Sequence, residues 1–183
     1  PDDAEFESAV AELETVIDEI VRRRRDDIGR EGDPDAPMDF LSILLRARGR
    51  GEQTDEQIRD EMMTMLLAGH DTTALTLTYT WYLLSEHPEV ERRVHDELDA
   101  VLGDGRPTMA DVRELEYTTW AIEEAMRLYP PVYTMFRSPT RPIEIDGYTV
   151  PAGTSIMLPQ WAVHRSEEYW EDPETFDPER FSP

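Results

Sequence analysis

The sequence contains no cysteine and no lysine in its 183 residues. Without cysteine, neither a disulfide framework nor a thiolate metal site can form within these residues. The absence is compatible with a reducing compartment, so we expect a cytoplasmic location.

Positive charge is scarce. Arginine supplies all 18 basic residues against 41 acidic ones, which gives a formal net charge of −23. Such a chain repels phosphate, so we expect no nucleic-acid partner. An excess of acid keeps a protein soluble but opposes compaction through self-repulsion, and halophilic proteins use this balance. We therefore hypothesise a salt-adapted protein, with an ordinary acidic surface as the alternative.

No uninterrupted apolar run of membrane-spanning character is present. The most apolar window, residues 62–85, contains His70, Asp71 and six threonines. Burying an ionisable group in a bilayer is costly. We therefore do not expect a membrane span.

Helical signals dominate the first two thirds of the chain, and β-strand signals follow them. A capping-box pattern at Thr54 and Gln57 predicts the start of a long helix, about 45 Å in length, with no proline until Pro88. The predicted helices cover 5–25 and 38–48, with a loop at 29–37 between them. They continue with the long helix that begins at Thr54, a helix that His87 and Pro88 begin and Gly103 ends, and a stretch that reaches Tyr129. Beyond residue 132, IEIDGYTV predicts a hairpin with an Asp-Gly turn, 155–163 a strand leading into a helix, and 164–183 an irregular tail. The expected fold class is mainly α with a small β-sheet.

The segment AGHDTT, residues 68–73, lies near the middle of the long predicted helix. Gly69 disfavours a helix interior by about 1 kcal/mol relative to alanine. Asp71, Thr72 and Thr73 offer the backbone competing hydrogen bonds. A helix selected only for stability would not place these residues together, so the segment indicates a functional site.

The pattern E-x-x-R occurs four times, and spacing alone makes it a weak signal, since it produces an ordinary helical ion pair. Glu124 and Arg127 differ from the other copies because apolar residues surround them and RLYPP begins at Arg127. A buried pair needs further partners. The sequence PERF at 178–181 supplies one more arginine, Arg180.

AGHDTT, then EEAMRLYPP, then PERF, in this order, resemble the cytochrome P450 family. The resemblance implies that residues 1–183 are part of a single cytochrome P450 domain, incomplete at both ends, and that the chain alone is inactive. The family binds haem b through a cysteine, which we expect downstream of this chain, so no metal ligand is expected within it.

By this resemblance, Asp71 and Thr72 are the expected catalytic residues, Asp71 feeding protons inward and Thr72 positioning them. Ala68 and Gly69, together with Thr72, are expected to bind the cofactor where the helix opens locally. Arg137 is expected to bind a haem propionate.

Val132, Tyr133, Thr134 and Met135 are expected to face substrate, with plain core packing as the alternative. Glu124, Arg127 and Arg180 are expected to be structural and to hold the fold around the haem. His164 and Arg165 also match the family's pattern, but no chemical role follows for them.

The implied function is that of a haem-thiolate monooxygenase. It inserts one oxygen atom from O₂ into a small organic, apolar substrate, with electrons from a donor protein, either a ferredoxin or a flavin reductase. Two alternatives stay open. One is a non-catalytic helical interaction module, and the other is an HD-type metal phosphohydrolase, prompted by the adjacent His70 and Asp71.

Overall fold

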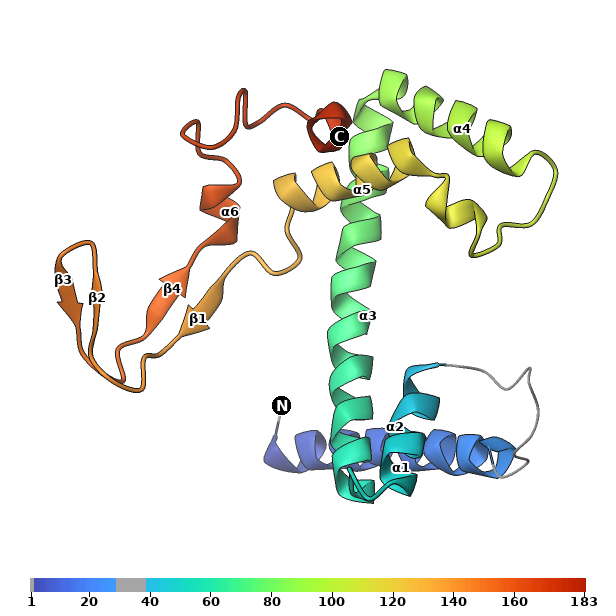
Figure 1. Cartoon of the computed structure of the whole chain (residues 1–183), viewed down its shortest axis with the longest axis vertical. Coiled ribbons are helices and arrows are strands. Elements are labelled where there is room, and N and C mark those ends of the chain that lie inside the picture. Colours follow the sequence, from blue (N-terminus) through green and yellow to red (C-terminus); the bar gives the residue numbers. More distant parts are fainter. Residues whose placement is uncertain (1, 29–38) are drawn as a thin grey trace. The chain divides into compact units, whose positions relative to one another are not determined.

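The computed structural model describes residues 2–28 and 39–183, so the loop expected at 29–37 and the first residue of the helix expected at 38–48 lie outside the described residues. The chain forms two compact units, Pro1–His70 and Asp71–Pro183. Figure 1 shows the order of the elements, which are helical up to α5 and include short strands beyond it. The fold class predicted from the sequence is therefore confirmed.

The first unit is built from α1 (Asp3–Ile28), α2 (Phe40–Gly49) and the beginning of α3 (Asp55–Glu86). These helices match the predictions within a few residues. Their apolar faces meet in a small core whose buried members are Leu41, Leu44, Leu45 and Ile58, with Val21 and Met62 packed against it.

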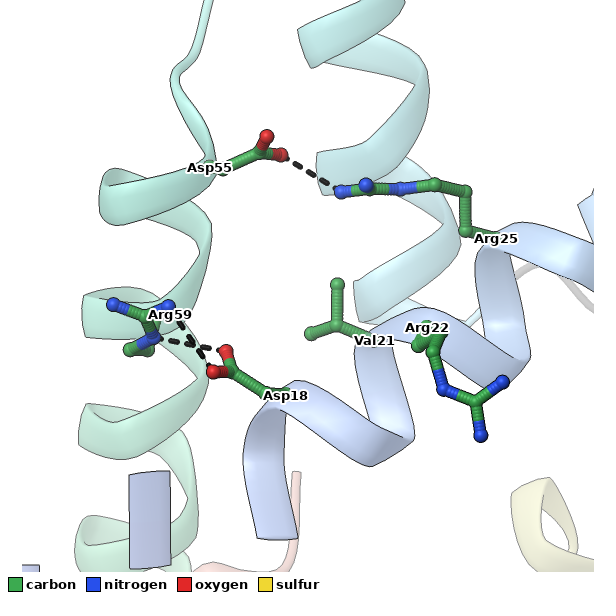
Figure 2. Close-up of a pocket in the computed structure, with 6 residues that line it drawn as sticks. All are labelled: Asp18, Val21, Arg22, Arg25, Asp55 and Arg59. Carbon is green, nitrogen blue, oxygen red and sulfur yellow. Dashed lines mark hydrogen bonds and ion pairs between the residues drawn. The ribbon is translucent and has the colours of Figure 1, made fainter. Parts of the chain in front are cut away.

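Ion pairs join the helices of this unit around a pocket of about 240 Å³ (Figure 2). Asp18 of α1 accepts from Arg59 of α3 at 2.9 Å, and Arg25 of α1 donates to Asp55 of α3 at 2.7 Å. Asp55 also accepts from Arg48 of α2 at 2.7 Å, and this hydrogen bond is the main reason why the pKa of Asp55 is lowered. The charges that line this pocket already have partners.

The start of α3 has the predicted capping box. The backbone N–H of Thr54 donates to Gln57 Oε1 at 2.9 Å, and the N–H of Gln57 donates to Thr54 Oγ1 at 3.2 Å. Each side chain thus satisfies a backbone donor that the first helical turn leaves without a partner.

The expected local opening of α3 at residues 68–73 is wrong, because the α-helix continues through them to Glu86. The hydroxyls of Thr76 and Thr80 donate to carbonyl oxygens four residues earlier, at 2.9 and 2.8 Å. A threonine hydroxyl can therefore form its hydrogen bond to a helix carbonyl without interrupting the backbone hydrogen bonds of the helix.

The second unit places α4 (Pro88–Leu102) and α5 (Glu116–Leu128) against the C-terminal part of α3 (Figure 1). As predicted, α4 starts with Pro88 at its first position and ends before Gly103. The Tyr79 and Tyr129 rings stack at 4.3 Å between centroids, which joins α3 to the end of α5. The buried core residues of this unit are Leu83, Leu84, Val90, Val94, Tyr117, Ala121, Ala125, Leu128 and Phe176.

The strands form two separate antiparallel ladders rather than the single small sheet that the sequence led us to expect. β2 (Ile143–Ile145) pairs with β3 (Tyr148–Val150) across the predicted turn, in which Asp146 and Gly147 have φ angles of 48° and 79°. β1 (Met135–Arg137) pairs with β4 (Ile156–Leu158). The first pairing follows from a local turn signal, whereas the second joins segments far apart in sequence and has no such signal.

The remaining elements are short. They are the 3₁₀ helices η1 (Asp111–Arg113) and η2 (Pro178–Phe181) and the helix α6 (Gln160–Val163). Of the helices that the structure describes, none combines the length and the apolar character needed to cross a membrane.

Candidate functional site

A pocket of about 580 Å³ lies within the second unit, between α3 and the chain that leaves α5. Its lining is largely apolar, with a few hydroxyl groups and one imidazole. The lining residues are Thr72, Thr73, Thr76, Leu77, Met126, Pro130, Pro131, Val132 and His164.

Helix geometry explains why α3 contributes four of these residues. Thr72, Thr73, Thr76 and Leu77 are spaced so that they share one face of an α-helix. The opposite wall forms because Pro130 and Pro131 cannot continue α5 and turn the chain past its end. The backbone N–H of Trp161 then donates to the carbonyl of Tyr133 at 3.1 Å, which ties α6 to this wall.

Next to the pocket, Arg127 forms a buried hydrogen-bond network that uses all five of its N–H groups. Nε and Nη2 donate to the two carboxylate oxygens of Glu124 at 2.6 and 2.8 Å. Nη1 donates to the carbonyls of His164 and Pro173, both at 2.7 Å, and Nη2 also donates to that of Thr175 at 3.1 Å. Because these carbonyls come from the C-terminal tail, one guanidinium fixes the path of that tail against α5.

The Glu124 carboxylate, which is 0% exposed, has further partners in the same tail. Its Oε1 accepts from the backbone N–H of Asp177 at 3.0 Å. Nε of Arg180 lies 3.4 Å from the same oxygen, in an ion pair without an aligned hydrogen bond. The Trp170 ring covers Arg127 at 5.0 Å from its centroid. Glu124, Arg127 and Arg180 thus form one cluster, called here the Glu124 cluster.

The structure brings two of the predicted catalytic, cofactor and substrate residues into the pocket, Thr72 and Val132. Asp71 is on the same helix but is exposed and is not part of the lining. Ala68 and Gly69 belong to the other unit. A Cβ added at Gly69 would meet nothing within 4 Å.

Four predicted residues lie after Val132 and do not line the pocket. Tyr133 is 65% exposed, and Thr134 donates to the carbonyl of Leu158 at 3.2 Å. Met135 and Arg137 are in β1, where the exposed Arg137 donates to the carbonyl of Phe136 at 2.9 Å. The structure therefore does not gather the segment 132–137 around one cavity.

Sequence reasoning missed most of the pocket lining. Helical spacing from Thr72 could have found Thr76, one turn away. Met126 belongs to the apolar surroundings of Glu124, and Pro130 and Pro131 follow the predicted end of a helix at Tyr129, but neither signal indicates a pocket. Nothing in the sequence indicated that His164, far along the chain, would reach this pocket.

Within residues 2–28 and 39–183, no three histidine, cysteine, aspartate or glutamate side chains come together in a way that could hold a metal ion. The phosphohydrolase alternative therefore has no ligand cluster in this part of the chain.

Comparisons with known proteins point to one family. The model of the cytochrome P450 family matches residues 1–183. The chain is 42% identical to cyclooctat-9-en-7-ol 5-monooxygenase of Streptomyces melanosporofaciens, in an alignment that covers 99% of this chain and 39% of that protein. It is 35% identical to the chloroplastic cytochrome P450 97B2 of Glycine max, over 99% of this chain and 34% of that protein. It is 36% identical to the chloroplastic carotene epsilon-monooxygenase of Arabidopsis thaliana, over 99% of this chain and 35% of that protein.

The chain thus spans about two fifths or less of the length of these curated relatives. The family match nevertheless extends over all of its residues, and it agrees with the mainly helical fold described above. The chain belongs to the cytochrome P450 family.

Proposed function

We propose that this chain is the central part of a haem-thiolate monooxygenase that inserts one oxygen atom from O₂ into an apolar organic substrate. One observation supports the proposal most directly. In a chain of this family, Thr72 of α3 and the apolar residues that follow α5 line the same pocket. The Glu124 cluster supports the wall from behind, since Arg127 is in α5 and bonds the carbonyl of His164.

The residues of the pocket fit a haem in part. Haem has broad apolar faces, and Met126, Pro130, Pro131 and Val132 offer it an apolar surface in a pocket of about 580 Å³. We propose that these residues hold the ring and that Arg137 binds one of its carboxylates. The chain supplies no thiolate, so the cysteine that holds the iron comes from outside these residues.

Haem, when bound, supplies the oxidising chemistry, and the residues of the chain control protons and access to it. A threonine hydroxyl both donates and accepts hydrogen bonds, so the hydroxyl of Thr72 can accept a proton from one partner and donate one into the pocket. Asp71, one residue earlier and exposed to solvent, is placed to take up protons. We propose that proton delivery runs from Asp71 to Thr72.

We propose that the substrate is apolar as well, since it would lie beside the apolar lining that holds the haem. Two relatives are named for the oxidation of cyclooctat-9-en-7-ol and of carotene, which agrees with this proposal. We also propose that a ferredoxin or a flavin reductase delivers the electrons and that the protein is cytoplasmic.

Thr72→Ala in the full-length protein tests the proposed proton delivery. With a ferredoxin and its reductase as electron source, we expect the share of electrons that end in hydrogen peroxide to rise several-fold, while haem content is unchanged. Thr72→Ser restores the hydroxyl and should restore the low share. The matched control is Thr78→Ala on the same helix, where the lost hydroxyl bonds Ala74 and does not line the pocket. Equal peroxide shares in Thr72→Ala and Thr78→Ala would contradict the assignment.

A further inference from the structure

We propose that Arg165 is a positioning residue for the haem pocket, because its guanidinium joins the two ends of the wall at residues 130–132 through two aromatic rings. The proposal rests on the proposed function, in which this wall holds the haem. It gives a role to a residue for which the family resemblance implied none. Arg165 follows α6 and lies within the second unit.

The guanidinium of Arg165 lies against two rings from different elements. Its Cζ is over the Trp161 ring of α6, at 4.6 Å from the ring centroid, and over the ring of Tyr129, which ends α5, at 5.6 Å. A guanidinium within about 6 Å of a ring centroid is attracted to the face of the ring. One side chain thus joins α6 to the end of α5.

The two rings belong to the two anchor points of the pocket wall. Tyr129 directly precedes residues 130–132, all of which line the pocket. The next residue is Tyr133, and its carbonyl accepts from the backbone N–H of Trp161 at 3.1 Å. The three wall residues therefore lie between two fixed points, and Arg165 connects these points to each other.

The rings, rather than polar partners, hold Arg165 in place. Its side chain is 11% exposed, whereas Glu174, whose Oε1 lies 3.2 Å from Nε, is 72% exposed. An ion pair with such an exposed partner contributes little. Among the described residues, none forms a hydrogen bond with the buried Nη1. A guanidinium suits such a place because it is planar, weakly hydrated and able to stack on rings.

The first anchor point is also joined to the opposite wall of the pocket. The Tyr129 ring stacks on that of Tyr79 in α3, at 4.3 Å between centroids, and α3 supplies the other wall. Loss of the guanidinium would leave this stack intact but would release Trp161 from Tyr129. We therefore expect the wall to lose its fixed position at the end near Tyr133.

The test measures circular dichroism in the Soret band of the haem-saturated, full-length protein. This signal depends on the atoms that surround the haem in the folded molecule, so a change in stability alone does not alter it. We expect Arg165→Gln to change the Soret ellipticity. We also expect it to speed the transfer of haem to apomyoglobin several-fold, because the wall no longer holds the ring in one position.

Three further variants separate the rings from the ion pair. Trp161→Leu removes one ring but keeps the backbone N–H, and it should change the Soret ellipticity as Arg165→Gln does. Since Trp161 is 50% exposed, this variant should fold even if Arg165→Gln does not. Trp161→Phe restores a ring and should restore the wild-type signal. Glu174→Gln removes the ion pair but neither ring, so it is the matched control and should leave the signal unchanged.

A wild-type Soret ellipticity in Trp161→Leu and in folded Arg165→Gln would leave Arg165 a purely supporting role and would overturn the proposal. An effect of Glu174→Gln as large as that of Trp161→Leu would overturn it as well, because the ion pair would then hold the wall. The carbon monoxide spectrum of the same wild-type sample reports separately on the proposed function. A thiolate band together with unchanged ellipticity in the variants rejects this inference alone, whereas a wild type without haem rejects the proposed function.

Discussion

Glu124 and Arg127 show how burial changes the meaning of a short sequence pattern. Glu19 and Arg22 have the same spacing and also form an ion pair, at 2.6 Å, but their side chains are 39% and 63% exposed. The side chains of Glu124 and Arg127 are 0% and 1% exposed. An exposed pair of this kind contributes at most about 1 kcal/mol, whereas breaking a buried pair costs about 3–5 kcal/mol.

We therefore predict that Arg127→Lys destabilises the full-length protein by about 3 kcal/mol or more, because an ammonium group cannot replace five directed N–H donors. The measurement is the free energy of unfolding from urea titration. Arg22→Lys, which changes the exposed copy of the same pattern, should leave the free energy of unfolding nearly unchanged. If the two variants lost similar amounts of unfolding free energy, the Glu124 cluster would not be what holds the C-terminal tail against α5.

Single residues were predictable from the sequence where their neighbours gave them a context. The apolar residues around Glu124 and the PERF sequence indicated a buried pair and a second arginine, and the structure brings these residues together. His164 had no such context, since its place in the fold depends on a contact with Arg127, 37 positions away.

At the scale of elements, the segment 68–73 of α3 departs from expectation, although the length of the helix was predicted well. AGHDTT predicted a local opening within the long helix, yet α3 is continuous there, and Gly69 has no neighbour that would exclude a side chain. Local penalties of about 1 kcal/mol are too small to break a helix of 32 residues. The described residues therefore give no internal reason for glycine at this position, and a bound cofactor remains the proposed reason.

Gly69→Ala tests this reason. We predict that alanine raises the free energy of unfolding of the haem-free protein by about 1 kcal/mol, because it favours the helix, and that it lowers haem occupancy several-fold, because it occupies space that the cofactor needs. Unchanged occupancy would remove Gly69 from the cofactor site. Gly147→Ala is a useful contrast, since the φ of 79° at Gly147 makes alanine destabilising in the turn without any effect on haem.

Elements with local signals were predicted well. The capping box at Thr54, the proline that opens α4 and the Asp146-Gly147 turn all depend on residues close together in the chain, and all are present. The β1–β4 ladder and the pocket wall after α5 depend on contacts between distant segments, and no local pattern indicates them.

At the scale of the whole molecule, charge is the dominant feature. A net charge of −23 works against compaction, and molar salt shortens the Debye length to about 3 Å. The same salt weakens exposed ion pairs such as Asp18 with Arg59, but each of these contributes little to stability because both side chains are exposed to solvent. The screening of the excess acid should outweigh this loss.

We therefore predict that the urea midpoint of the full-length protein is higher in molar KCl than in dilute buffer. Sucrose at equal osmolarity is the control, because it favours burial of surface without screening charge. If the urea midpoint were the same in KCl and in dilute buffer, salt would not stabilise the protein, and the salt-adapted hypothesis would fail.

The central claim, a haem-thiolate monooxygenase of which this chain is the central part, is tested most directly by one spectrum. The full-length protein is purified, reduced and exposed to carbon monoxide, and its absorption is compared with that of the reduced protein alone. We predict the red-shifted band that a thiolate-ligated haem gives with carbon monoxide. A protein that contains no haem, or whose haem gives the spectrum of histidine ligation, would contradict the claim.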